Sequence, residues 1–114
     1  MHDYVQLIKR DTHKIAAILT REHGKTIGES KGDTFRGQEF VESSCGASHI
    51  LTGETIENIS KGIDCYSFRK PLGVCAGIVA YNSPVMIALW LFPIAITCGN
   101  TYILKPSRKT PESV

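Results

Sequence analysis

The most apolar part of the chain lies between residues 72 and 107, and its pattern predicts a strand, a helix and a second strand. Residues 72–79 form a short run of small and β-branched side chains, and residues 85–97 form an apolar run long enough for a helix. The turn-forming residues 81–84 separate these two runs. A Cys-Gly-Asn stop then precedes the β-prone residues 101–104. This order predicts a βαβ unit whose two strands are parallel in one sheet.

Residues 1–53 carry a helical pattern that several glycines interrupt. An apolar stripe opens the chain, and Asp11 is predicted to be the N-cap of a second helix. Thr26, followed three residues later by Glu29, matches a capping box, in which each side chain satisfies a backbone donor of the other residue. The spacing of apolar residues then predicts a longer helix over residues 33–53, which its glycines weaken.

Residues 54–71 predict a β-hairpin. Two β-prone runs, residues 54–59 and 63–71, flank a Lys-Gly pair that suits a turn. A two-stranded ribbon is marginal by itself and tends to pair with another strand edge. The chain therefore divides into a helical segment at 1–53, this ribbon, and an α/β unit at 72–114.

Composition limits the classes of function. A chain of 114 residues fits one ordinary domain, and a formal net charge of +2 without a basic tract predicts no nucleic-acid partner. The apolar run at 85–97 is too short to span a bilayer and contains Pro93, so we expect no membrane association. The start of the sequence shows no targeting peptide. None of the four cysteines forms a CxxC pair or has zinc-ligand spacing to a histidine, which predicts no metal site and a reducing compartment.

Polar side chains follow both strands of the predicted βαβ unit. Tyr81 and Asn82 come after the first strand, and Lys105 and Ser107 come after the second. Ligands of parallel sheets bind outside the carboxyl ends of the strands, so this edge is the candidate site. The residues alone leave two alternatives open for each side chain. The amide of Asn82 can stabilise an oxyanion or form an Asx turn, and Lys105 can bind a ligand or remain solvated.

Six motifs occur together in this chain. They are EHGKT at 22–26, GDTFRG at 32–37, YSFRKPLGVCAGI at 66–78, NSP at 82–84, CGNT at 98–101 and LKPS at 104–107. The last three, with the apolar helix between them, resemble the aldehyde dehydrogenase superfamily, and the first three resemble its CoA-acylating methylmalonate-semialdehyde branch. The resemblance covers nearly all of the chain. It implies N-terminal helices, a β-hairpin and the first βαβ unit of a Rossmann-like cofactor domain, and, because family members are several times longer, an N-terminal fragment.

The resemblance assigns roles to the polar residues at the sheet edge. Asn82 matches the catalytic residue that stabilises the oxyanion formed when a thiolate adds to the aldehyde. Lys105 matches the residue that binds the adenosine ribose of the cofactor NAD, and Ser107 would lie on the same wall. Val79 and Tyr81 match positions that line the nicotinamide half of the cofactor site.

Four residues depart from the pattern of the family. Ala80 stands where proline is usual, Tyr81 where Phe or Trp is usual, and Ser83 where Phe is common. Arg108 stands where this branch usually has a glutamate that accepts hydrogen bonds from ribose hydroxyls, whereas arginine can only donate. Our hypothesis is that Arg108 contacts the cofactor and either weakens the binding of NAD or shifts the preference toward NADP.

The implied activity of the parent enzyme is NAD-dependent oxidation of (methyl)malonate semialdehyde to an acyl-CoA, a step of valine and pyrimidine catabolism, with CoA as co-substrate. The resemblance also implies a homo-oligomer that pairs through the ribbon, in the mitochondrial matrix or in the cytoplasm of a bacterium. No cysteine here matches the family nucleophile, so these 114 residues alone are expected to be inactive. A truncated form that acts only through subunit pairing, and a product without function, are the alternatives. By analogy, another helix would begin with Thr110 as its N-cap and Pro111 as its first residue.

Overall fold

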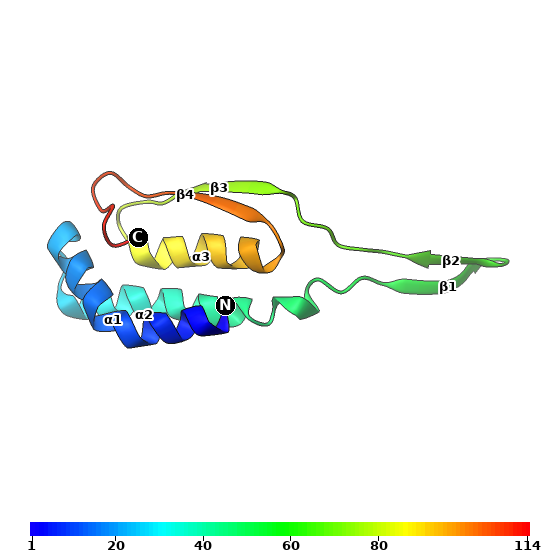
Figure 1. The fold of residues 1–114 in the computed structure, drawn as a ribbon, viewed down its shortest axis with the longest axis horizontal. Coiled ribbons are helices and arrows are strands. Elements are labelled where there is room, and N and C mark those ends of the chain that lie inside the picture. The colour runs from blue at the N-terminus through cyan, green and yellow to red at the C-terminus, as the bar shows by residue number, and fades with distance from the viewer.

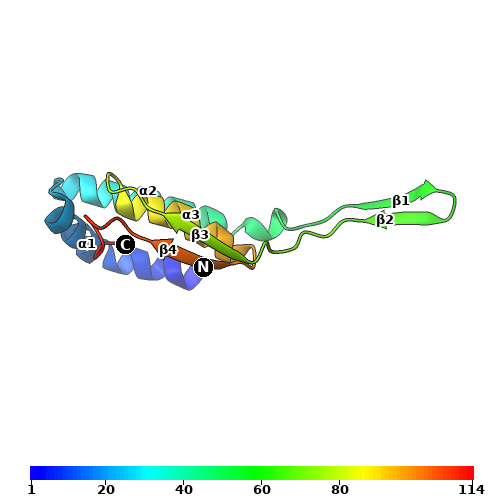
Figure 2. The ribbon, with the colours of Figure 1, turned by 90° about the horizontal axis from the view of Figure 1, so that it is seen from above.

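A computed structural model describes all 114 residues and shows three α-helices, a short 3-10 helix and two two-stranded sheets. The elements are α1 (His2–His23), α2 (Ile27–Ser44), η1 (Ala47–His49), β1 (Thr55–Ser60), β2 (Ile63–Tyr66), β3 (Val74–Ile78), α3 (Pro84–Thr97) and β4 (Thr101–Lys105). The helices and the β3–β4 sheet gather at one end, and the β1–β2 ribbon projects from the other (Figure 1). The view from above shows the same elongated shape, whose dimensions are 66 × 25 × 18 Å (Figure 2).

The β3–α3–β4 segment forms the predicted βαβ unit. Strands β3 and β4 pair in parallel, with Val74 opposite Thr101 and Ile78 opposite Lys105. The Val79 amide continues this pairing by donating to the Lys105 carbonyl oxygen at 3.0 Å. The carboxyl ends of the two strands therefore lie side by side, which confirms the arrangement that the sequence predicted.

Asn100 joins the end of α3 to the beginning of β3. Its Oδ1 accepts hydrogen bonds from the amides of Leu72 at 2.6 Å and Gly73 at 3.0 Å. Its Nδ2 donates to the Ala95 carbonyl oxygen, also at 3.0 Å. One side chain thus bonds two amides that precede β3 and a carbonyl oxygen in the last turn of α3. A Gly-Asn stop therefore suits this position.

The helical segment is simpler than its sequence pattern predicted. The prediction that Asp11 begins a second helix is wrong, because residues 2–23 form one continuous helix. Buried apolar residues lie on both sides of Asp11, from Val5 to Leu19, so the packing of one long face outweighs a local N-cap signal. Asp11 instead pairs at the surface with its neighbour Arg10.

Helix α2 begins at the capping box that the sequence predicted, and it takes the place of the longer helix expected over residues 33–53. The Thr26 hydroxyl accepts from the Glu29 amide at 3.2 Å, and the Glu29 carboxylate accepts from the Thr26 amide at 2.8 Å, which confirms the capping box. The helix predicted over residues 33–53 is wrong at both ends, because α2 is already formed before that range and stops at Ser44. The Ser44 hydroxyl donates to the Val41 carbonyl oxygen at 2.7 Å and so takes an acceptor that a continuing helix would use.

The predicted hairpin is confirmed, although its second strand is shorter than expected and ends at Tyr66. The strands pair antiparallel, with Thr55 opposite Tyr66 and Ser60 opposite Ile63. Every residue of both strands is exposed, so no other part of the chain covers the ribbon.

The predicted C-terminal helix with Thr110 as its N-cap is wrong. The Thr110 amide closes a turn by donating to the Ser107 carbonyl oxygen at 3.2 Å, and Thr110 itself is buried. The Glu22 carboxylate of α1 accepts hydrogen bonds from the amides of Glu112 at 2.6 Å and Ser113 at 2.9 Å. These bonds hold the last residues against α1 in a non-helical conformation.

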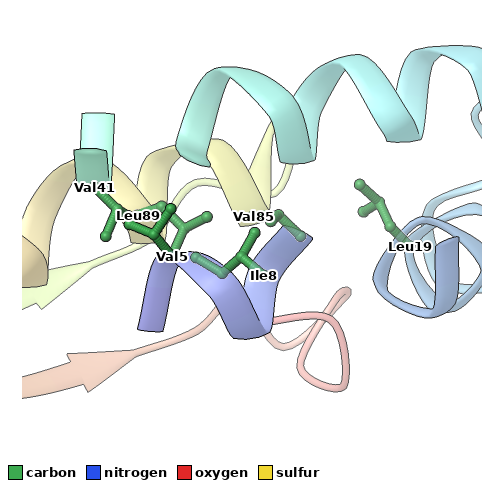
Figure 3. Packing of buried hydrophobic residues seen from close by; sticks show 6 residues of the cluster. All are labelled: Val5, Ile8, Leu19, Val41, Val85 and Leu89. Carbon is green, nitrogen blue, oxygen red and sulfur yellow. The ribbon is translucent and has the colours of Figure 1, made fainter. Parts of the chain in front are cut away.

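The apolar core lies among the three helices (Figure 3). Its buried members are Val5, Ile8 and Leu19 of α1, Val41 of α2, and Val85 and Leu89 of α3. Helix α2 packs against both α1 and α3, so it transmits the position of α1 to the βαβ unit. None of these helices has an apolar stretch long enough to cross a membrane.

The close approach of α2 to α3 depends on Gly37. A Cβ atom at Gly37 would lie 2.6 Å from Cδ1 and 3.0 Å from Cβ of Leu89, so Gly37→Ala overpacks the core. We expect this variant to lose about 1 to 3 kcal/mol of unfolding free energy in urea denaturation. Gly32→Ala is the control, because nothing lies within 4 Å of its added Cβ. The control should gain about 0.5 to 1 kcal/mol from helix propensity, and an equal gain at Gly37 would contradict the account.

Candidate functional site

The parallel pairing of β3 and β4 brings the predicted site residues to one edge of the sheet. Tyr81 and Asn82 lie in the loop that leaves β3, and Val79 is buried at the base of that loop. Lys105 is the last residue of β4, and Ser107 lies two residues beyond it. The structure therefore places the candidate oxyanion donor and the candidate ribose-binding residue on neighbouring strand ends.

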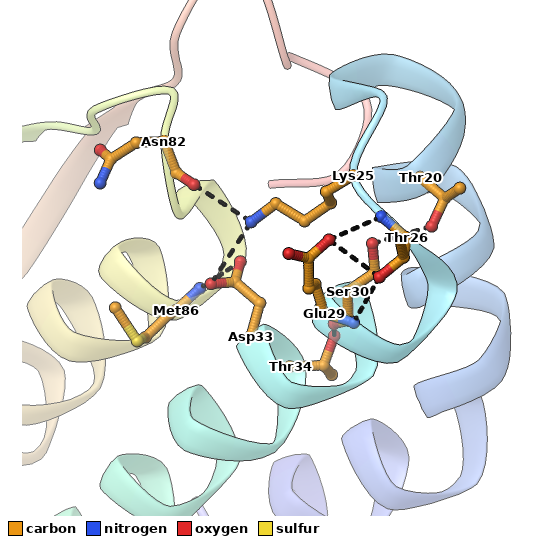
Figure 4. Close-up of polar contacts among 9 residues, drawn as sticks. All are labelled: Thr20, Lys25, Thr26, Glu29, Ser30, Asp33, Thr34, Asn82 and Met86. Carbon is orange, nitrogen blue, oxygen red and sulfur yellow. Dashed lines mark hydrogen bonds and ion pairs between the residues drawn. The ribbon is translucent and has the colours of Figure 1, made fainter.

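The Asn82 residue presents different groups to its two sides. Its backbone oxygen accepts a hydrogen bond from the Lys25 ammonium at 3.1 Å. Its carboxamide points away from Lys25 and is solvent-accessible (Figure 4). The amide NH2 is therefore available to a ligand at the sheet edge, while the backbone of the same residue is fixed from behind.

Asp33 of α2 completes the polar contacts behind this loop. Its side chain is only 4% exposed, and its Oδ1 lies 3.9 Å from the Lys25 ammonium, which is 12% exposed. Its Oδ2 accepts a long hydrogen bond, 3.5 Å, from the Met86 amide in the first turn of α3. A carboxylate at a helix N-terminus is stabilised by the helix dipole. Asp33 therefore accepts from a free amide in the first turn of α3 and balances the charge of Lys25 (Figure 4).

The connection between α1 and α2 aims Lys25 at the loop. Gly24 ends α1 in the left-handed region, with φ of 85°, and its amide donates to the Thr20 carbonyl oxygen at 2.9 Å. Thr26 begins α2 as its N-cap. The hydroxyls of Thr20 and Ser30 are 2.8 Å apart and tie the two helices together beside the turn. Lys25 is thus the single residue between two capped helix ends.

Tyr81 contacts two basic side chains. Its ring stacks on His23 with a centroid distance of 5.7 Å and an interplanar angle of 23°. The Lys109 ammonium lies 4.6 Å from the centre of the same ring, a cation–π contact. Both ring nitrogens of His23 are buried without a hydrogen-bond partner.

Lys105, Ser107 and Arg108 form a cationic, donor-rich segment. The Lys105 ammonium donates to the Pro106 carbonyl oxygen at 2.9 Å, which leaves two of its three donors free. The Ser107 hydroxyl accepts from the Lys109 amide at 3.2 Å and retains its own proton. Arg108 is exposed. The free donors of Lys105 and Ser107 fit the hydroxyls of a nucleotide ribose, whereas Arg108 cannot accept from those hydroxyls.

Sequence reasoning did not assign a role to Lys25, Asp33, His23 or Lys109. Lys25 and Asp33 are in motifs that carried the family resemblance, and a lysine placed between a left-handed glycine and an N-cap is a visible signal. Their contact with the Asn82 loop leaves no such trace, because the bond reaches a backbone oxygen 57 residues away. No group of three or more His, Cys, Asp or Glu side chains in the structure could hold a metal ion.

A parallel βαβ unit with polar side chains beyond the carboxyl ends of its strands is typical of nucleotide-binding α/β proteins. The chain belongs to the aldehyde dehydrogenase family, whose model matches residues 1–114. It is 53% identical over 111 residues to a mitochondrial acylating methylmalonate-semialdehyde dehydrogenase of Arabidopsis thaliana, covering 97% of this chain and 18% of the relative. A human mitochondrial methylmalonate-semialdehyde/malonate-semialdehyde dehydrogenase is 50% identical over 108 residues, covering 95% of this chain and 20% of the relative.

Solved structures agree with these sequence relatives. A methylmalonate-semialdehyde dehydrogenase of Oceanimonas doudoroffii superposes with a TM-score of 0.94 at 44% identity, covering 96% of this chain and 22% of that one. A Sinorhizobium meliloti protein provisionally named as the same enzyme, complexed with NAD, also gives a TM-score of 0.94, at 46% identity and with the same coverage of both chains. The present chain therefore spans about a fifth of the length of the proteins that it matches.

The capping box predicts a pH dependence of stability. Hydrogen bonds from the backbone amide and then the side chain of Thr26 lower the pKa of Glu29 below its ordinary value of 4.5. Because the folded-state pKa is depressed, this stabilisation is complete above pH 4.5 and is lost as the pH falls through the folded-state value. Thermal melts of the wild type and Glu29→Gln should therefore differ at pH 7, and the difference should shrink steadily as the pH falls below 4.5. A difference that does not shrink in acid would contradict this origin.

Proposed function

We propose that this chain supplies the oxyanion donor and the adenosine-ribose wall of an enzyme that oxidises (methyl)malonate semialdehyde to an acyl-CoA, with NAD as oxidant. One observation carries the proposal. In a chain about half identical to methylmalonate-semialdehyde dehydrogenases, Asn82 and Lys105 lie on adjacent carboxyl ends of parallel strands. The whole reaction needs residues that this fifth of the length does not contain.

Asn82 acts on the aldehyde oxygen. When a thiolate adds to the aldehyde carbon, the carbonyl oxygen gains negative charge, and a preorganised amide donor stabilises that charge more than it stabilises the neutral aldehyde. The exposed carboxamide of Asn82 has the donor chemistry for this role. Fixing the Asn82 backbone beforehand lowers the cost of reorganisation during the reaction.

Lys105 and Ser107 act on the cofactor. The two free donors of the Lys105 ammonium and the hydroxyl of Ser107 suit the ribose hydroxyls of the adenosine half. Val79 and Tyr81, at the neighbouring strand end, line the nicotinamide half. NAD held by these residues would supply the hydride acceptor for the oxidation, and CoA would be the acceptor of the acyl group.

The ribbon supports a second, compatible function in assembly. Its exposed side chains include Ile56, Ile63 and Tyr66, each at least half exposed, and an open apolar strand pair favours pairing with another chain. We propose that the parent enzyme is a homo-oligomer built partly through this ribbon, and that it acts in the mitochondrial matrix, or in the cytoplasm if the source is bacterial. A polypeptide limited to these residues would pair without turning over substrate.

The proposed role of Asn82 is tested in a full-length chimera. In this chimera, residues 1–114 replace the matching segment of the Arabidopsis thaliana relative. Asn82→Asp keeps the side-chain size and removes the amide donor, so we expect kcat to fall about 10²- to 10³-fold with little change in the KM for NAD. Gln6→Glu, the same amide-to-carboxylate change at an exposed position of α1, should leave kcat unchanged. An Asn82→Asp chimera with wild-type kcat would contradict the proposal.

The chimera also tests the proposed contact of Arg108 with the cofactor. Arg108→Glu replaces a donor by an acceptor for ribose hydroxyls and removes the charge that would attract a 2′-phosphate. We expect the ratio of kcat/KM for NAD to that for NADP to rise at least about tenfold, or ~1.4 kcal/mol. Arg69→Glu makes the same charge change at an exposed position before β3 and controls for net charge. Equal ratios in both variants would mean that Arg108 makes no cofactor contact.

A further inference from the structure

We propose that Lys25 and Asp33 are positioning residues that set the orientation of the Asn82 carboxamide from the helical segment. This inference rests on the proposed role of Asn82 as the oxyanion donor. It assigns to the connection between α1 and α2 a part in the reaction, although the Asn82 carboxamide points away from both residues (Figure 4).

Lys25 fixes the backbone of Asn82. The Lys25 ammonium binds the Asn82 carbonyl oxygen at 3.1 Å, which fixes the peptide plane between Asn82 and Ser83. The side chain of Asn82 leaves from the same Cα in the opposite direction (Figure 4). With this peptide plane fixed, rotation of the backbone at Asn82 no longer swings the carboxamide across the sheet edge. A donor that is misplaced by about 1 Å can cost about 10²-fold in rate.

Asp33 contacts the other end of the loop, where α3 begins. The loop enters α3 directly after Ser83, and the Asp33 carboxylate faces the amide of Met86, the third residue of that helix, at 3.5 Å. Asp33 thus fixes the helix that follows Asn82, while Lys25 fixes Asn82 itself. Lys25 directly precedes the N-cap of α2, which the capping box fixes, and Asp33 lies on α2 itself, which packs closely on α3 where Gly37 meets Leu89.

Lys25 and Asp33 carry opposite charges. Both side chains are nearly buried, at 12% and 4% exposed, so each charge is screened little by solvent and depends on the other. A charged donor bound to a carbonyl oxygen also makes a stronger hydrogen bond than a neutral one. Lys25 therefore has two separable effects, since it neutralises Asp33 and it orients Asn82. A test must distinguish them.

The experiment uses the full-length chimera and begins with Lys25→Met, which keeps the length of the side chain and removes the ammonium. We expect kcat to fall about 10- to 100-fold, while the KM for NAD changes less than twofold, because the cofactor wall is untouched. Lys25→Arg, which can still donate to the Asn82 carbonyl oxygen, should recover part of the loss. Lys31→Met on α2 is the matched control and should retain wild-type kcat.

The double variant Lys25→Met/Asp33→Asn separates orientation from charge balance. It removes both charges, so we expect a melting temperature closer to the wild type than that of Lys25→Met, with kcat still reduced at least about tenfold. If Lys25→Met fails to fold, this double variant carries the test. Wild-type kcat in the double variant would overturn the proposal, because charge balance alone would then explain Lys25.

The outcome also distinguishes this inference from the function on which it rests. If Asn82→Asp lowers kcat and Lys25→Met does not, the oxyanion role stands and the positioning role is overturned. If Asn82→Asp leaves kcat unchanged, the oxyanion role fails, and any loss in Lys25→Met then has another cause, which overturns the positioning role as well.

Discussion

The hydrogen bond between the Lys25 ammonium and the Asn82 backbone oxygen joins the helical segment to the edge of the sheet. The βαβ unit alone brings Asn82 near Lys105, but it supplies no contact that fixes the loop between β3 and α3 from behind. That contact comes from the turn between α1 and α2, and it is formed by a side chain with little access to water. The candidate site is therefore a product of two segments that are distant in sequence, and its rigidity depends on how α2 packs against α3.

The same dependence explains several features of the core. A glycine at position 37 permits the close approach of α2 to Leu89, and the capping box at Thr26 fixes where α2 begins. Asn100 closes the opposite end of the βαβ unit by satisfying three backbone groups. Together these contacts fix both ends of α3, so that the loop before it has few conformations left to adopt.

The fold and part of the site could be predicted from the sequence because their signals are local. Alternation of apolar runs and turn residues specified the βαβ unit, and its parallel strands placed the polar residues Asn82 and Lys105 at one edge of the sheet. The signals that failed were also local. Asp11 is a residue type that favours the N-cap position, but the packing of α1 outweighs this preference. Thr110 is followed by a proline, as an N-cap often is, but the bonds of the Glu22 carboxylate to the amides of residues 112 and 113 outweigh that signal. Lys25 could not be assigned, because its acceptor is a backbone atom and no pattern of residue types records it.

The central claim is that one sheet edge presents an oxyanion donor and a ribose-binding lysine, with the donor's backbone fixed by Lys25. A crystal structure of the chimera with NAD bound tests this claim most directly. The account predicts the Lys105 ammonium within hydrogen-bond distance of the adenosine ribose hydroxyls, the Asn82 carboxamide directed at the space beside the nicotinamide, and the Lys25 ammonium still on the Asn82 carbonyl oxygen. A structure in which Lys105 extends into solvent, or in which Lys25 has left the Asn82 carbonyl oxygen, would contradict it.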